Sequence, residues 1–419
     1  MARSSDAPTD NAALDAWDAP VPALMKNGRL SEAAAIVKAR LAEVPDDVQA
    51  RFLMGMIAIA QNEYRQAIRA FRAILIDQPR ATRVRLELAR AFFLSKDYAN
   101  ALTQFRFALA DDPPESVQAN IRQYLGAIRQ AKSVSYNFSL SIAPDTNLNG
   151  GSSAREVTLF GLPFDLSDDA RQRSGVGLAL EAGAEWAPQI GAGKRLRLGI
   201  QGQRREYKGS SFDDMTVAAY AGPRIASGKW DLSLLGTGYR RWHGSRPYNR
   251  AIGARFESTY YVNPRTAVST GIALQSVRHD GQRERDGVLA SISSSALRAL
   301  SSSSAVTVKL GASRENARLD AFSNRSAFVA VGYFRELPMG FSAYVEPSLS
   351  IARFDEALPA FGKKRSDSTQ SITLALLNRR IVLDRFTPRV AYTFTRQSST
   401  IALYDFRRSR LELGVTTSF

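Results

Sequence analysis

Two hydrophobic periods divide the chain near residue 132. Before that point apolar residues follow helical spacing, and after it they alternate with polar residues to the end of the chain. The first pattern predicts α-helices, and the second predicts strands with one apolar and one polar face. We therefore expect an α + β multidomain chain with a flexible N-terminus (1–13), a helical domain (14–131) and a β domain (132–419).

The helical part repeats every 34 residues. Pro45, Pro79 and Pro113 keep this interval, and so do the regions NGRL, QNEY and SKDY. Such a period is typical of stacked helix-turn-helix units, here of the tetratricopeptide type, and ESVQANIRQYLGAIRQAK predicts a closing helix. The domain is either a scaffold or a groove that holds a peptide. Small residues at helix crossings and apolar residues in the grooves between helices are expected at Ala33, Val37, Gly55, Ala67, Phe71, Ala89, Phe92, Ala101 and Phe105.

The alternating part contains fourteen segments, most of them 11 to 14 residues long. In KRLRLGIQGQRREY, Leu196 and Leu198 lie on one face, and Arg195 and Arg197 lie on the other. A tilted strand crosses a bilayer with about 9 to 11 residues, and closure pairs every backbone group within lipid. We expect a 14-stranded antiparallel transmembrane β-barrel with its apolar face toward lipid. The segments are 132–143, 174–186, 194–206, 212–222, 229–242, 250–261, 265–277, 284–297, 303–314, 324–335, 340–353, 366–379, 385–396 and 407–419.

The connections between these segments alternate in length. APQIGAG, VNP and ELPM are short, whereas HGSRPYN, ENARLDAFS and FDEALPAFGKKRS are longer. Short turns at one end and longer loops at the other are typical of outer-membrane barrels. A soluble β-sandwich is the alternative, but it rarely needs fourteen uniformly long strands.

The net charge of +16 suits nucleic acid, anionic lipid headgroups or an acidic transported substrate. Nucleic-acid binding is disfavoured, because the arginines are spread over alternating strand positions and form no recognition helix. The polar face predicts a basic lumen, although basic residues at the rim would also suit lipopolysaccharide. The lumen-facing candidates are Arg195, Arg197, Arg205, Lys309 and Arg389.

The chain offers little catalytic chemistry. It has no cysteine, and its two histidines are His243 and His279, both expected at loop edges. His279 stands beside Asp280, but no G-x-S-x-G motif accompanies either histidine. We expect neither an enzyme nor a cofactor.

The stretch APDTNLNGGSSARE matches the spacing of a calcium loop, with Asp145, Asn147, Asn149 and Glu156 as ligand candidates. An EF-hand loop needs a helix on each side, and the flanking residues here alternate. We therefore favour a tight rim turn in which Pro144 ends the strand, Asp and Asn side chains bind loop amides, and two glycines allow the reversal.

Two stretches resemble a known family. YNFSLSIAPDTNLNG is similar to the barrel start of the surface lipoprotein assembly modulators, an aromatic strand followed by Ala-Pro-Asp-x-Asn-x-Asn, here with Pro144, Asp145, Asn147 and Asn149. The tail FTPRVAYTFTRQSSTIALYDFRRSRLELGVTTSF resembles the same family. The positions that match in this tail are Pro388, Tyr392, Ser399, Tyr404, Arg408, Gly414 and Phe419.

The resemblance implies a bacterial outer-membrane translocon with periplasmic repeats, which exports or displays a lipoprotein or a soluble secreted protein. The repeat region is short for that family, which puts a substrate-holding role in doubt. Exopolysaccharide export and a general porin are the alternatives. Polysaccharide exporters of this kind carry longer repeat arrays, and porins need no repeats.

The two ends of the chain carry further expectations. The N-terminus has no apolar stretch of signal-peptide length, so we expect that a leader was removed and that Met1 replaces it. The last strand has the form of an address for the barrel-assembly machinery, with Leu411, Leu413, Val415 and the terminal Phe419 on one face. The expected partners are therefore a client protein, outer-membrane lipid with lipopolysaccharide, and that machinery.

Overall fold

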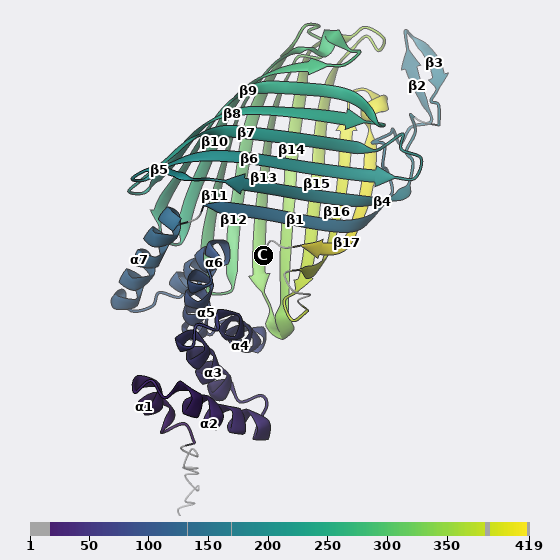
Figure 1. The fold of residues 1–419 in the computed structure, drawn as a ribbon. Helices are drawn as coiled ribbons and strands as arrows, with labels where there is room; N and C mark the ends of the chain where they lie inside the picture. Colours follow the sequence, from purple (N-terminus) through teal and green to yellow (C-terminus); the bar gives the residue numbers. More distant parts are fainter. Residues whose placement is uncertain (1–16, 132, 169, 382–385, 417–419) are drawn as a thin grey trace, which may run out of the picture.

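The computed structural model describes residues 17–131, 133–168, 170–381 and 386–416. These residues form an N-terminal stack of helices below one end of a large β-barrel (Figure 1). Within these ranges, no helix is both long and apolar enough to cross a membrane. The helices are α1 Val21–Lys26, α2 Leu30–Glu43, α3 Val48–Ala60, α4 Tyr64–Asp77, α5 Thr82–Leu94, α6 Tyr98–Ala110 and α7 Glu115–Ala131.

The 34-residue period appears in the backbone as well as in the sequence. Gly28, Asn62 and Lys96, each 34 residues after the last, lie in the turns within the helix pairs and have φ of 73°, 61° and 63°. This left-handed conformation ends one helix so that the next can fold back beside it. Asp47 and Asp97 then cap α3 and α6 by accepting from the amides of Ala50 and Asn100. The predicted helical repeats are confirmed.

The helix crossings have the small and large residues that the repeats require. At Gly55 a Cβ atom would lie 2.5 Å from the ring of Phe71, which is fully buried. Phe105 stacks on Tyr124 of α7 with ring centroids 4.9 Å apart, so α7 closes the stack. These rings belong to a buried cluster that runs from α3 to α7, and a second cluster joins α1, α2 and the other face of α3.

The long strands form a closed antiparallel barrel in which each strand pairs with its neighbours in sequence. The ring closes where β1 pairs with β17, with Ser139 opposite Thr416 and Ile142 opposite Leu413. The predicted 14-stranded barrel is confirmed within the described residues. Its strands are β1 Val134–Asp145, β4 Gly175–Trp186, β6 Lys194–Tyr207, β7 Asp214–Ser227, β8 Trp230–His243, β9 Arg246–Asn263, β10 Thr266–His279, β11 Gly287–Ser301, β12 Ser304–Ala317, β13 Asn324–Glu336, β14 Phe341–Leu358, β15 Lys363–Asn378, β16 Thr387–Ser399 and β17 Phe406–Thr416.

Several connections differ from the prediction. HGSRPYN is mostly strand, because a two-residue turn at Gly244 and Ser245, with φ of 56° and 62°, is enough to join β8 to β9. β14 and β15 likewise extend into FDEALPAFGKKRS. The first loop contains a hairpin, β2 Glu156–Leu159 with β3 Leu162–Asp165, and a short β5 at Gln189–Gly191 precedes β6. Short 3-10 turns also occur at Arg283–Arg285, Pro338–Gly340 and Ala402–Tyr404.

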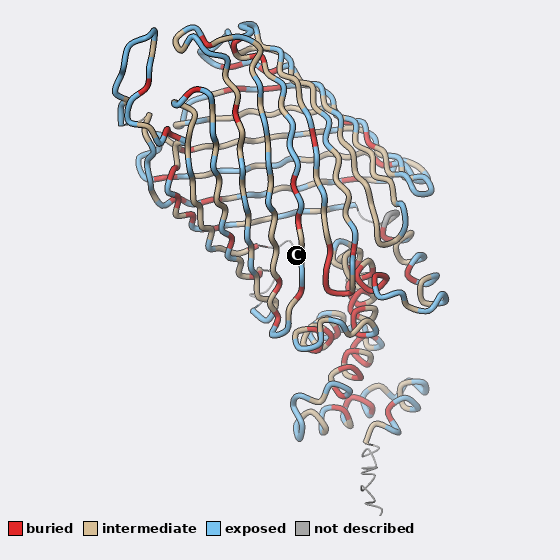
Figure 2. The backbone as a smooth tube through the Cα atoms, turned by 180° about the vertical axis from the view of Figure 1, so that it is seen from behind, coloured by how far each residue is buried: buried red, intermediate tan, exposed pale blue. Residues whose placement is uncertain are grey.

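The two faces of the barrel differ in exposure, as the alternation predicts. On β8, Leu234 points outward and is 57 % exposed, whereas the adjacent Leu235 points inward and is fully buried. Along many of the strands, residues of intermediate burial alternate with exposed ones in the same way (Figure 2). The outward apolar residues form the band that contacts lipid. This band includes Ile142, Leu178, Ile200, Ile252, Leu274, Ile292, Leu310, Val329, Ile351, Leu374 and Leu413.

Candidate functional site

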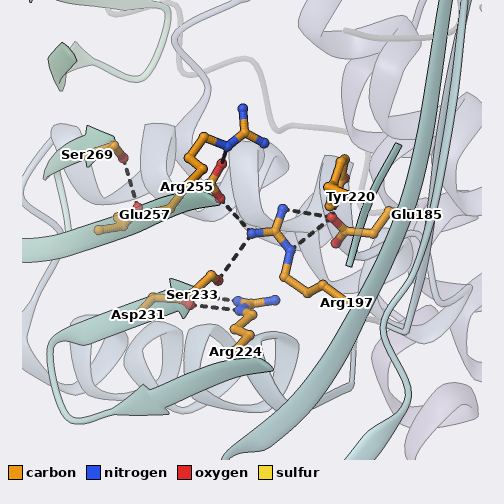
Figure 3. Close-up of polar contacts among 10 residues, drawn as sticks. Glu185, Arg197, Tyr220, Arg224, Asp231, Ser233, Arg255, Glu257 and Ser269 are labelled. Carbon is orange, nitrogen blue, oxygen red and sulfur yellow. Dashed lines mark hydrogen bonds and ion pairs between the residues drawn. The ribbon is translucent and has the colours of Figure 1, made fainter. Parts of the chain in front are cut away.

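The inner wall of the barrel holds a connected network of charges around Arg197 (Figure 3). Arg197 on β6 binds Glu185 of β4 through Nη2 at 2.7 Å and Glu257 of β9 through Nη1 at 2.6 Å. Glu185 also accepts from the Tyr220 hydroxyl at 2.6 Å. These residues lie on β4, β6, β7 and β9, and β6 and β9 are not neighbours in the barrel. Side chains from strands that are not neighbours can meet only on the concave, inner face of the barrel.

Other luminal cations are also paired. Lys309 of β12 lies 2.6 Å from Glu346 of β14, and Arg224 Nε donates to Asp231 at 2.7 Å. Arg389 approaches Glu412 less closely, at 3.9 Å. The wall is therefore a set of cation–carboxylate pairs rather than a bare basic surface.

The five lumen-facing candidates have different surroundings. Arg197, Lys309 and Arg389 take part in the pairs described above. Arg195 is buried at the helical end, where its Nη1 donates to the Ala187 carbonyl at 2.6 Å and holds the turn before β6. Arg205 lines a cavity of about 460 Å³ near the opposite end, together with Arg241 and Arg408.

Sequence reasoning missed the acidic partners of these cations. Glu185, Glu257, Glu346 and Glu412 occupy inward positions by the same alternation that identified the arginines and the lysine. Counting both signs on the inward face would have found them. Which cation meets which carboxylate depends on strand register, and the sequence alone does not give it.

The helical domain docks onto the inner wall at one mouth of the barrel. Phe107 of α6 stacks on Phe334 of β13, with ring centroids 5.9 Å apart and planes 10° apart. Ala299 and Ala305 complete this buried apolar contact. The wall residues occupy inward positions, which would be polar in a water-filled lumen. Their apolar character is explained by the helix that covers them.

A buried ion pair fixes the same junction. Arg85 of α5 lies 2.6 Å from Glu336 at the end of β13, and their side chains are 0 % and 4 % exposed. Arg85 also donates to the Pro79 carbonyl at 2.6 Å, and Arg379 reaches Glu336 at 3.1 Å. Two cations that share one buried carboxylate hold the repeats against the turns that follow β13 and β15. Losing Glu336 would leave two buried guanidinium groups without a carboxylate, whereas losing Arg85 would leave Glu336 paired with Arg379 alone.

The loop after α6 makes further polar contacts with the turns between strands. Asp111 accepts from the Ser302 amide at 2.9 Å and from the Thr82 hydroxyl at 2.5 Å, and Asp112 pairs with Arg265 at 2.5 Å. Burial tends to raise the pKa of Asp111, but hydrogen bonds from Ser302 and Thr82 outweigh it and hold this pKa below the ordinary value. The ionised carboxylate therefore favours the docked arrangement.

A cavity of about 320 Å³ lies between the helices and the inner wall beside this contact. Leu75, Leu88 and Phe92 line its helical side, and Leu297 and Leu377 line its barrel side. Four arginines also border it, Arg72, Arg106, Arg265 and Arg379, and burial lowers the pKa of Arg72 and of Arg379. The site therefore combines an apolar wall with poorly solvated positive charge.

The loop APDTNLNG links the first strand of the barrel to the last strand. Asp145, the last residue of β1, accepts from Arg408 of β17 at 2.5 to 3.0 Å through both carboxylate oxygens, and its side chain is fully buried. Asn147 accepts from the Gly151 amide and donates to the Arg407 carbonyl at 3.2 Å. Gly150 has φ of 61°, as the predicted reversal requires. The motif therefore connects the first strand to the last.

Other expectations for this loop have mixed outcomes. Pro144 does not end the strand, because β1 continues to Asp145, with Pro144 opposite Val176 of β4. Asn149 accepts from the Arg173 amide at 3.1 Å, as a loop cap should. Glu156 lies in β2, and both oxygens of Asp145 bind Arg408, so neither is placed as a calcium-loop ligand. No group of three or more His, Cys, Asp or Glu suited to a metal occurs in the described ranges.

The remaining candidates occupy ordinary positions. Leu411, Leu413 and Val415 follow one face of β17, and Leu413 is 44 % exposed on the lipid side, while Phe419 lies outside the described residues. His279 is buried with its Nε2 3.4 Å from the Asn249 amide nitrogen. His243 lies 3.4 Å from Asp214 at the mouth away from the helices.

Comparisons with known proteins agree over most of the chain. A family model described as Surface lipoprotein assembly modifier matches residues 135–419, and its companion for N-terminal TPR repeats matches 37–105. A Surface lipoprotein assembly modifier from Moraxella catarrhalis is 29 % identical over 53 % of this chain, and the match spans 44 % of that protein's own length. Surface lipoprotein assembly modifier 1 of Neisseria meningitidis is 23 % identical over 88 % of this chain and 76 % of its own length.

Among solved structures, the toluene transporter TodX of Pseudomonas putida aligns with 68 % of this chain and 89 % of its own. The sequence identity is 10 % and the TM-score is 0.36. The barrel assignment therefore rests on the strand pairing described above.

Proposed function

The chain belongs to the surface lipoprotein assembly modifier family, and from this premise we propose that it is an outer-membrane translocon that brings a lipoprotein client to the cell surface. The observation that carries the proposal is the match of the family model to the whole barrel, residues 135–419. The barrel lies in the outer membrane. Exopolysaccharide export and general diffusion are not favoured, because the family match covers both the repeats and the barrel.

We further propose that the helical repeats lie in the periplasm. The helices and the end of β17 are at the same mouth of the barrel, whereas the long loop of residues 146–174 is at the other (Figure 1). At the helical mouth, the β7–β8, β9–β10 and β11–β12 connections have two residues each, whereas at the other mouth only the β8–β9 connection between described strands is that short. Short periplasmic turns and longer external loops are usual in outer-membrane barrels, which supports this orientation.

In this proposal the protein moves its client without making or breaking a bond. The docked helices cover part of the inner wall at the periplasmic mouth, so the client meets this junction before it reaches the lumen. The paired charges around Arg197 then offer a polar path whose cations are already neutralised. Lipopolysaccharide at the far rim and the barrel-assembly machinery at β17 complete the set of partners, without a role for nucleic acid.

Deletion of the gene tests the function directly. The surface exposure of lipoproteins encoded beside the gene would be measured by protease shaving of intact cells, with immunoblots of lysates as a control for total amount. We expect a client that stays abundant in the lysate but becomes resistant to external protease, and restoration by the intact gene. Unchanged exposure of every lipoprotein would contradict the proposal, and loss of surface polysaccharide would favour the alternative exporter.

A further inference from the structure

The cavity between the helical repeats and the inner wall has an apolar lining where a barrel lumen is normally polar. Leu297 of β11 and Leu377 of β15 point inward, and α6 covers Phe334 between them. The docking of α6 explains Phe334 and its alanine neighbours, but Leu297 and Leu377 also face a space of about 320 Å³. Leu75, Leu88 and Phe92 close this space from the helical side.

One edge of the cavity carries polar groups that lack partners within the described residues. The hydroxyls of Ser342 and Thr387 are buried, at 2 % and 0 % residue exposure, and neither makes a hydrogen bond. Arg379 binds Glu336 through Nη1, while its Nε and Nη2 are buried without a partner. A buried donor without an acceptor costs about 1 to 3 kcal/mol. Three such side chains at one edge of an apolar cavity therefore indicate a ligand that supplies acceptor oxygens.

The volume narrows the class of ligand. An engineered cavity of roughly 150 Å³ holds one benzene ring, so a cavity of about 320 Å³ holds on the order of a dozen carbon atoms. An acyl chain fits this description, because it is apolar along its length and ends in a carbonyl group. A peptide strand fits less well, because much of its polar backbone would lie against the leucine and phenylalanine side chains that line the space.

We infer that this cavity binds an acyl chain of the client's lipid anchor, with its ester or amide carbonyl accepting from Arg379, Ser342 and Thr387. The inference rests on the proposed function, because it takes the client to be a lipoprotein. The site lies at the periplasmic mouth, so an acyl chain held there would bring the lipid-bearing end of the client to the entrance of the lumen.

Photo-crosslinking on the purified full-length protein in nanodiscs tests this site. The probe is a synthetic diacylated lipopeptide with a diazirine at the end of one acyl chain. We expect crosslinks to the peptides that contain Leu75, Leu88 or Leu297, competed by unlabelled lipopeptide but not by the same peptide without acyl chains. Leu297→Trp, which fills the cavity, should reduce this crosslinking by about tenfold or more.

Two matched variants keep the result interpretable. Leu300→Trp places the same ring on the lipid side of the same strand, at a residue that is 48 % exposed, and should leave crosslinking unchanged. Ser342→Ala combined with Thr387→Val should weaken competition by the lipopeptide while preserving the cavity volume. The heat-dependent gel mobility of the barrel verifies that each variant is folded.

Several outcomes would overturn the inference. Crosslinks confined to the lipid-facing band, or equal labelling of the Leu297→Trp and Leu300→Trp proteins, would show that the cavity is not the site. Equal competition by a free fatty acid would show a general acyl site and remove the assignment to the client's anchor. Because binding is measured on purified protein, these results are separate from the surface-exposure test, and normal export without labelling would reject only the cavity.

Discussion

Asp145 on the first strand of the barrel and Arg408 on the last strand form an ion pair in which Arg408 Nη2 lies 2.5 Å from Asp145 Oδ2. The two residues are 263 positions apart, and each lies in one of the two stretches that resemble the family. The Asp145 side chain is fully buried, and that of Arg408 is 23 % exposed. Asp145 of the Ala-Pro-Asp-x-Asn-x-Asn motif, which begins the barrel, therefore forms its ion pair with the last strand.

Asp145→Ala should destabilise the closed barrel. It removes a buried carboxylate and leaves Arg408 without its bidentate partner, a loss that typically costs about 3 to 5 kcal/mol. Urea unfolding in detergent, followed by gel mobility, measures this difference. Asp168→Ala is the matched control, because Asp168 is 83 % exposed in its pair with Arg171 and should change stability by less than about 1 kcal/mol. Equal effects of the two substitutions would contradict a closing role for Asp145.

Arg85→Met should loosen the helical domain from the barrel. Glu336 would keep Arg379 as a partner, so the expected loss is that of one charge-assisted hydrogen bond between helices and barrel, about 1.5 to 3 kcal/mol. The chain has no cysteine, so Ser302→Cys, at a fully buried position, reports opening by its rate of maleimide labelling. We expect labelling to accelerate by about tenfold or more.

The control for this junction is Arg90→Met, which removes a cation that is 42 % exposed and lies 3.5 Å from Glu87. It should leave the labelling of Cys at position 302 unchanged. Glu336→Gln should accelerate labelling more than Arg85→Met does, because it leaves the buried guanidinium groups of Arg85 and Arg379 without their shared carboxylate. Labelling that is insensitive to Arg85 would show that the ion pair does not hold the junction.

The sequence could predict the repeats and the barrel because both have strict periods. Gly55, Phe71 and the fourteen alternating segments follow from spacing alone. The pairing of Arg197 with Glu257 could not be predicted, since it depends on register across three strand boundaries. The apolar inward residues Leu297 and Phe334 were a readable signal of helix docking. Nothing in the sequence, however, places α6 rather than another helix against them.

Gly55→Ala should destabilise the repeat domain. The added Cβ would lie 2.5 Å from the Phe71 ring, which is fully buried, so overpacking of about 1 to 3 kcal/mol is expected. Gly126→Ala in α7 is the matched control, because nothing lies within 4 Å of its Cβ position. It should be stabilising by about 0.5 to 1 kcal/mol through helix propensity. Thermal melting by circular dichroism at the helical band measures both, and a Gly55→Ala protein as stable as Gly126→Ala would contradict the packing.

Acid should weaken the docking of the repeats through Asp111. Burial opposes the charge, but the Ser302 and Thr82 hydrogen bonds outweigh it, and the pKa of Asp111 is lowered in the folded protein from its ordinary value of 3.8. A lowered pKa contributes stability that is fully present above the unfolded value and is lost as pH falls through the folded value. Maleimide is too slow in acid, so opening would be followed by pepsin cleavage of the loop after α6 between pH 4 and pH 2. Asp111→Asn should raise cleavage at pH 4 and flatten its pH dependence, whereas Asp112→Asn, which keeps both hydrogen bonds to Asp111, should retain the slope. A slope that survives in the Asp111→Asn protein would assign the acid sensitivity to another group.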